Sequence, residues 1–200
     1  MVVKIMTRPS LISILMFHYS LPNLKHIEKN MEITTEHSVI IAHTLTATKQ
    51  TISVAESSTA GLISAALLGV PGASAYYGGG AIIYTMRARR KLLDLSKEQL
   101  NSQTPLTEDY VTLCAERIKA RLKTTWGLAE LGATGPAGTP YGHPPGIAVL
   151  ALVGPVNLTT KIETGHGDRE RNMDFFKTAA IKLLVEGLEK YQASIKNSRK

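Results

Sequence analysis

The sequence has few of the residues that form disulfides, metal centres or nucleic-acid-binding surfaces. Its single cysteine, Cys114, excludes an internal disulfide and a cysteine-based metal site. Scarce cysteine favours a reducing compartment, so we expect a cytoplasmic protein. Only 6% of the residues are aromatic, and they are not interleaved with a basic face, which argues against nucleic-acid binding.

Long apolar runs are also missing. The run LISILMF, at residues 11–17, has seven residues, whereas a membrane-spanning helix needs about 20, so we expect no membrane association. Residues 1–30 contain one carboxylate, Glu28, and differ in composition from the rest of the chain. The sequence predicts a poorly ordered extension at 1–30, one α/β domain at 31–195 and a basic tail at 196–200. A presequence and an upstream start codon are alternative explanations of the extension.

The positive charge is moderate and partly local. Residues 87–91, RARRK, and 196–200, KNSRK, hold seven of the 23 lysine and arginine residues behind the net charge of +7. The first cluster has the pattern of a solvated helix face. A net positive charge of this size is also compatible with a phosphorylated small molecule as ligand.

Helical and strand patterns alternate from Met31 onward, which predicts an α/β domain with a mixed sheet covered on both faces. The last two strands are separated by Gly154 and Pro155 and form a hairpin, so part of the sheet is antiparallel. Strands are expected at 51–55, 81–84, 128–133, 146–153 and 157–165, and helices at 37–49, 61–69, 86–95, 107–122 and 172–191.

The stretch TISVAESSTAG, residues 51–61, is the strongest candidate for a functional site. An apolar strand pattern ends in Glu56, Ser57, Ser58 and Thr59, and a helical pattern comes next. Ligands of α/β sheets bind at such strand ends, where the free amides of a helix start favour anions. Ser58 or Thr59 suits the helix N-cap, and capping is the commoner role of such residues. A serine here is a nucleophile only if a base is within reach.

Two more polar, glycine-containing segments follow predicted strands or lead into them. One is Gly78 to Gly80 with Tyr84, and the other is the loop 132–138, GATGPAG. Without large side chains, their backbone amides can approach a phosphate or a carbonyl closely. The loop lacks the Lys-Ser/Thr ending of a P-loop.

These motifs together resemble the C-terminal domain of the CinA family. AESSTAG, VPGASAYYGGGAIIYT, GATGPAG, PPGIAVLAL and GDRERN have the order of the family motifs AESCTGG, PGSS with GxxxYxNxxK, GIAGPGG, PVGTV and SGDR. The resemblance covers residues 36–191. It implies a three-layer α/β/α domain with a five-stranded mixed sheet, in agreement with the strand count above.

The resemblance also implies an activity. Active family members are nicotinamide-nucleotide amidohydrolases, which convert nicotinamide mononucleotide to nicotinic acid mononucleotide and ammonia. Carried over, Ser57 is the nucleophile, Tyr84 is its proton partner, and the backbone amides near Ser58 and Thr59 are the oxyanion donors. From its place between a strand end and a helix start, Glu56 is expected either to orient Ser57 or an Arg or Lys partner in the site, or to serve only as a cap of the helix. The phosphoribosyl part is held by one arginine, Arg169, and by residues of the glycine loop, which are Gly132, Thr134, Gly135 and Gly138.

A further implication is that the protein forms a homo-oligomer, often a dimer. Because no metal-ligand set is visible in the sequence, we expect a metal-independent site, and the reaction needs no redox cofactor. One departure from the family pattern bears on activity, since Arg89 stands where the family has a lysine. A guanidinium keeps its proton, so Arg89 is expected in the catalytic site as a group that stabilises negative charge but cannot act as the base. The sequence therefore predicts an amidohydrolase or, alternatively, a nucleotide-binding protein without turnover; a structural or regulatory subunit is a third alternative.

The remaining chemistry-bearing residues are assigned structural roles. Cys114 falls on the apolar face of a helix and Trp126 precedes a strand, so both are expected in the core. His143 and His166 lie in loops without an acid at triad-like spacing. In place of the family glycine, Ala60 is expected to have an ordinary backbone conformation.

Overall fold

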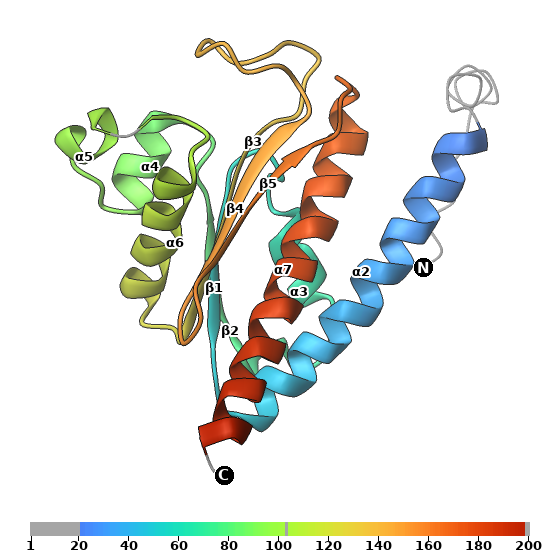
Figure 1. Ribbon diagram of the computed structural model, residues 1–200, viewed down its shortest axis with the longest axis vertical. Coiled ribbons are helices and arrows are strands. Elements are labelled where there is room, and N and C mark those ends of the chain that lie inside the picture. The colour runs from blue at the N-terminus through green and yellow to red at the C-terminus, as the bar shows by residue number, and fades with distance from the viewer. Residues whose placement is uncertain (1–20, 103, 199–200) are drawn as a thin grey trace, which may run out of the picture.

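The computed structural model describes residues 21–102 and 104–198, and the first twenty residues lie outside this range. Three layers are visible in Figure 1, where a five-stranded sheet separates α4, α5 and α6 from α2, α3 and α7. This arrangement confirms the predicted three-layer α/β/α class with a mixed sheet. The helices are α2 Leu21–Ala47, α3 Leu62–Leu68, α4 Met86–Leu92, α5 Lys97–Asn101, α6 Glu108–Leu122 and α7 Arg169–Ser198, with a 3-10 turn at Ala73–Ala75. The strands are β1 Ile52–Glu56, β2 Tyr77–Ile82, β3 Trp126–Ala133, β4 Ile147–Val153 and β5 Leu158–Glu163.

The strand order is β2-β1-β3-β4-β5. Strands β2, β1 and β3 run parallel, whereas β4 is antiparallel to β3 and to β5, as the predicted hairpin requires. Strands β1 and β4 are buried along their whole length, while side chains of the edge strands β2 and β5 alternate between partly buried and exposed. The carboxyl ends of β2, β1 and β3 therefore meet at one edge of the sheet, together with the segments that continue from them.

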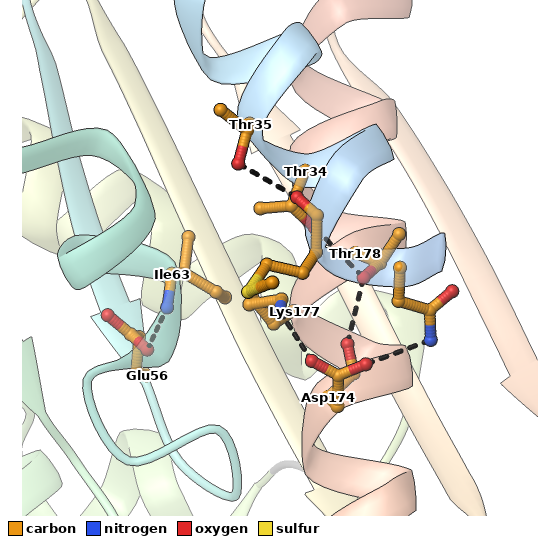
Figure 2. A network of polar contacts seen from close by, with 9 residues as sticks. Thr34, Thr35, Glu56, Ile63, Asp174, Lys177 and Thr178 are labelled. Atoms are coloured by element: carbon orange, nitrogen blue, oxygen red, sulfur yellow. Dashed lines mark hydrogen bonds and ion pairs between the residues drawn. The ribbon is translucent and has the colours of Figure 1, made fainter. Parts of the chain in front are cut away.

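The N-terminal helix is longer than the sequence predicted. We expected the domain to begin near Met31 and its first helix at His37, but α2 begins at Leu21. Polar contacts hold α2 to α7. The amide of Asn30 donates to Asp174 at 2.8 Å. The hydroxyls of Thr34 and Thr178, which are labelled in Figure 2, lie 3.1 Å apart. Residues 144 apart in the sequence make these contacts, so local patterning did not indicate them.

Strand β2 also differs from the prediction. It includes the three glycines, which we expected to lead into a strand at 81–84, and it ends before Tyr84. A side chain at Gly80 would lie 2.5 Å from the hydroxyl of Tyr77 and 2.9 Å from that of Ser64, so glycine lets the strand approach α3. The short helix α5, capped by Ser96, was not predicted. In the described ranges, no helix is long and apolar enough to span a membrane.

Candidate functional site

The turn between β1 and α3 is organised by a buried carboxylate. Glu56, 1% exposed, accepts hydrogen bonds from the main-chain N–H groups of Gly61 at 2.9 Å, Ile63 at 3.0 Å and Ser64 at 2.8 Å, as well as from the Ser64 hydroxyl. Figure 2 shows the bond to Ile63. Glu56 therefore satisfies the free amides at the start of α3. The predicted N-cap, Ser58 or Thr59, is wrong, since Gly61 occupies that position without a side-chain cap.

A second buried carboxylate, Glu130 of β3, holds the turn from the other side. It is the register partner of Glu56 and is fully buried. Its Oε2 accepts the N–H groups of Ser57 and Thr59, both at 3.0 Å, and the Thr59 hydroxyl at 2.9 Å, while its Oε1 accepts the Ser58 hydroxyl. Burial raises the pKa of Glu130, and the hydrogen bonds from Ser58 and Thr59 act in the opposite direction.

These hydrogen bonds determine which N–H groups and hydroxyls of the turn are free to bind a ligand. The N–H of Thr59 already donates to Glu130, so in this arrangement it is not free for the oxyanion role that the resemblance implied. The hydroxyls of Ser58 and Thr59 also point to carboxylates. Ser57 differs, because its hydrogen bonds to Glu130 are made by its main-chain N–H and leave its hydroxyl for the adjacent cavity.

That cavity brings the three predicted catalytic residues together. It has a volume of about 250 Å³, and Ser57, Tyr84 and Arg89 lie on its wall. Tyr84, which comes after β2, is 56% exposed, whereas Ser57 is 3% exposed. The other lining residues are Met86, Pro105, Leu106, Leu131, Gly132, Thr139, Pro140 and Tyr141.

Arg89 is fixed in the cavity wall by its neighbours. Its Nε donates to the carbonyl of Ile83 at 3.1 Å, and its Nη1 donates to the hydroxyl of Tyr110 at 3.1 Å. The guanidinium carbon also lies 5.3 Å from the centre of the Tyr110 ring, within cation–π range. Burial raises the pKa of Tyr110, and the hydrogen bond from Arg89 opposes that shift. The cavity thus has a fixed positive charge in its wall.

A second, adjoining cavity of about 170 Å³ contains the predicted phosphate-binding set. It shares Tyr84, Gly132, Thr139 and Pro140 with the first cavity, and Ser58 is in its wall. Arg169, at the start of α7, donates from Nη1 to the carbonyl of Gly135 at 2.9 Å. All five residues expected to bind the phosphoribosyl part line this cavity: Gly132, Thr134, Gly135, Gly138 and Arg169.

Two residues that support the site were missed in the sequence. Besides Glu130, Asn172 of α7 is fully buried and donates to the carbonyls of Thr134 and His166, both at 2.8 Å. Its side-chain oxygen accepts the Thr164 hydroxyl at 2.6 Å. Asn172 thereby ties the glycine loop to the start of α7, which carries Arg169. The only signal in the sequence was its place directly after GDRER.

Ala60 has a backbone conformation that the sequence analysis did not expect. Its φ is +54°, in the left-handed region, rather than the ordinary value predicted. Alanine at this angle is strained by roughly 1 kcal/mol or more, a cost that glycine avoids. The turn therefore requires the conformation for which the family motif has glycine, although this chain has alanine there.

Replacing Ala60 by glycine should raise the free energy of unfolding by roughly 1 kcal/mol, because the strain disappears. Ala65, exposed within α3, provides the matched control: the same substitution there should lower the free energy of unfolding by about 0.5–1 kcal/mol. Urea denaturation followed by circular dichroism measures both. Equal losses in the two variants would contradict the role of the left-handed turn.

The residues assigned to packing or to loops lie as expected. Cys114 is fully buried, and burial raises the pKa of its thiol to about 12. Trp126, also fully buried, begins β3 and donates to Gln50 at 3.1 Å. His143 lies in a loop and contacts the carbonyl of Pro105. In the part of the chain that the structure describes, no group of three or more His, Cys, Asp or Glu side chains could hold a metal.

The fold and the site define a class: a three-layer α/β protein with a candidate ligand site beyond the carboxyl ends of parallel strands. The family model of the CinA C-terminal domain matches residues 34–188. The chain therefore belongs to the CinA C-terminal domain family, as the motifs indicated.

Curated relatives and solved structures agree with this assignment. A CinA-like protein of Parasynechococcus marenigrum (strain WH8102) is 39% identical over 132 residues, which are 66% of this chain and 31% of the relative. A CinA-like protein of Gloeobacter violaceus is 35% identical over 146 residues, 73% of this chain and 34% of the relative. The chain thus spans about a third of the length of these relatives. A crystal structure of a CinA superfamily protein from Klebsiella pneumoniae 700603 matches with a TM-score of 0.73 and 26% identity, over 78% of this chain and 98% of that chain.

Proposed function

We propose that this protein hydrolyses the carboxamide of nicotinamide mononucleotide, or of a related amide, to the acid and ammonia with Ser57 as nucleophile. The observation that carries the proposal is the shared wall of the two cavities. Ser57 and Tyr84 face one cavity, while Tyr84 and Arg169 face the other. An amide-bearing ring in the first cavity and a sugar phosphate in the second would place both ends of the nucleotide on complementary groups. Their volumes, about 250 and 170 Å³, together fall in the lower part of the range for small-ligand sites, about 300–1,000 Å³.

The chemistry assigned to each group depends on its type. In this proposal the Ser57 oxygen attacks the carboxamide carbon, and the Tyr84 phenol, which lines the same cavity, acts as its proton partner. Arg89 supplies positive charge near the oxygen that becomes negative, but it cannot take up the serine proton. Arg169 suits the phosphate, because a guanidinium binds phosphate with two parallel hydrogen bonds.

A second candidate is a nucleotide-binding protein without turnover, and Arg89 is the observation that favours it. Both candidates use the same cavities and differ only in proton transfer.

We also propose that the protein acts in the cytoplasm as a homodimer on a small-molecule nucleotide, without nucleic acid or membrane partners. Light scattering of the purified chain would test the dimer.

Incubation with nicotinamide mononucleotide and measurement of released ammonia tests the function. We expect slow turnover by the wild type and an increase of roughly tenfold or more in Arg89→Lys, because an amine can exchange the serine proton. Arg90→Lys, the exposed neighbour on α4, is the control and should leave the rate unchanged.

A rise in melting temperature with the nucleotide, without ammonia from the wild type, would favour the binding protein. Absence of both binding and turnover would overturn the proposed function.

A further inference from the structure

The two cavities contain nucleophile, phenol and cations but no evident base. Among the described residues that line them there is no lysine, histidine, aspartate or glutamate. The ionisable groups in their walls are those of Tyr84, Arg89, Tyr141 and Arg169. A phenol and a guanidinium both hold their protons strongly at neutral pH. A proton acceptor must therefore lie behind the cavity wall, if the chain supplies one.

Glu130 lies directly behind that wall. Ser58 lines the second cavity, and its hydroxyl donates to Oε1 of Glu130. The other carboxylate oxygen of Glu130 accepts the N–H of Ser57, the proposed nucleophile. Gly132, which lines both cavities, leaves room for this arrangement: a side chain there would clash with the Ser58 hydroxyl and lie 2.8 Å from Oε1 of Glu130. The Ser58 hydroxyl thus connects the second cavity, which adjoins the one that Ser57 lines, with a fully buried carboxylate.

Glu130 and Glu56 share a hydrogen-bond donor. The two are register partners on adjacent parallel strands, and the single hydroxyl of Thr59 lies 2.9 Å from the Glu130 carboxylate and 3.0 Å from that of Glu56. Glu56 also accepts three main-chain N–H groups at the start of α3, whereas Glu130 accepts two, those of Ser57 and Thr59. Glu130, whose pKa is raised by burial, is the member of the pair that accepts a hydroxyl from a cavity wall.

The surroundings of Glu130 provide no cation to change this assignment among the described contacts. Its neighbouring strands contribute Glu56 from β1 and the apolar register partner Leu150 from β4. From α7, the apolar Phe176 reaches the adjacent Gly132. The charged pair of α7, Lys177 with Asp174, lies on the side of α7 that faces α2, where Asp174 also accepts a hydrogen bond from Asn30.

We propose that Glu130 accepts the proton of the reacting serine through the hydroxyl of Ser58 and returns it to the leaving amine. This inference rests on the proposed function only in taking Ser57 as the nucleophile. As the bond from the Ser57 oxygen to the carbonyl carbon forms, the Ser57 proton passes to the Ser58 oxygen and the Ser58 proton passes to Glu130. When the carbon–nitrogen bond breaks, the proton returns by the same route to nitrogen, and ammonia leaves. Water then attacks the carbonyl carbon and gives its proton to Glu130 by the same route. The bond to the Ser57 oxygen breaks, the proton returns to that oxygen, and the acid leaves.

In this scheme Glu130 is a positioning residue, because it acts through Ser58 and also holds the main chain of Ser57 in place. Burial raises its pKa, which brings the carboxyl group nearer to the pH at which it can both take up and release a proton. A purely structural role would account for the hydrogen bonds alone. The two roles differ in the pH dependence of serine reactivity.

A fluorophosphonate probe, which labels reactive serines without needing the natural substrate, separates the two roles. The rate of labelling is measured from about pH 5 to 9, and the labelled serine is identified by mass spectrometry. We expect wild-type labelling on Ser57, with a rate that rises with pH through one ionisation. Glu130→Gln, which keeps the shape of the side chain, should slow labelling roughly 100-fold and remove that ionisation. Glu163→Gln, at an exposed carboxylate, is the matched control and should change neither.

Ser58→Ala keeps Glu130 but removes the hydroxyl that connects it to the cavity, so this variant should also slow labelling roughly 100-fold. If Glu130→Gln does not fold, Ser58→Ala separates the proton-transfer role from the structural role. The inference is overturned if a folded Glu130→Gln or Ser58→Ala variant keeps the wild-type pH profile of labelling, or if Ser57 of the wild type is not labelled. Labelling that depends on Glu130 but no ammonia from nicotinamide mononucleotide would reject the proposed substrate and leave this inference standing.

Discussion

Replacing Glu56 by alanine is expected to lower the free energy of unfolding by about 3–5 kcal/mol, the largest stability change among the substitutions considered for this protein. The substitution removes the acceptor of three main-chain N–H groups at the start of α3 and of the hydroxyls of Ser64 and Thr59. Each buried donor left without a partner costs roughly 1–3 kcal/mol, and water entering the cavity left by the carboxylate recovers part of that cost.

Urea denaturation of Glu56→Ala beside Glu163→Ala gives the measurement and its control. Glu163 is a surface carboxylate, with 61% of its side chain exposed and an ion pair to Lys161 at 2.7 Å. Solvent-exposed pairs of this kind contribute little to stability, so the control should remain close to the wild type. If the free energy of unfolding fell by the same small amount in both variants, the start of α3 would not depend on the buried carboxylate.

Replacing Ser57 by alanine is expected to abolish ammonia release, by at least about a thousandfold, without lowering the free energy of unfolding by more than roughly 1 kcal/mol. The structural bonds of Ser57 are made by its main-chain N–H, which alanine retains, whereas the hydroxyl lines the cavity. Loss of the nucleophile should therefore affect the reaction and not the fold.

Two further measurements on Ser57→Ala separate chemistry from binding. The shift in melting temperature with nicotinamide mononucleotide should match that of the wild type, because Arg169 and the glycine loop are unchanged. Ser102→Ala, at an exposed serine after α5, is the control for a general effect of removing a hydroxyl. Undiminished ammonia release by Ser57→Ala would exclude this serine as nucleophile.

The sequence predicted those parts of the site that lie in polar turns. Ser57, Tyr84 and Arg89 come after the carboxyl ends of strands β1 and β2, and the order of the motifs placed the glycine loop beside them. Sheet topology brings these turns to one edge, so strand patterns with polar turns indicated Ser57 and Tyr84, whereas Arg89 and the roles of all three residues came from the resemblance to the family motifs.

The residues that support those turns were not predictable in the same way. Glu130 lies inside an apolar strand pattern, and its importance depends on its register with Glu56 and on its bond to Ser57, which is 73 positions away in the sequence. The left-handed angle of Ala60 and the early start of α2 likewise depend on tertiary contacts, which override local preference. Local patterns could not reveal any of these three features.

The two walls of the site are held in different ways. One wall is the turn at residues 57–59, whose polar groups are bonded to two buried carboxylates. The other is the long segment between β3 and β4, which is closed at its base, where the N–H of Gly146 donates to the carbonyl of Ala133 at 2.7 Å. Its tip carries Tyr141, which is exposed and lines the first cavity, and the ring of His143 contacts the carbonyl of Pro105. A change in the tip should therefore alter the shape of the ligand cavity while the reacting oxygen keeps its place.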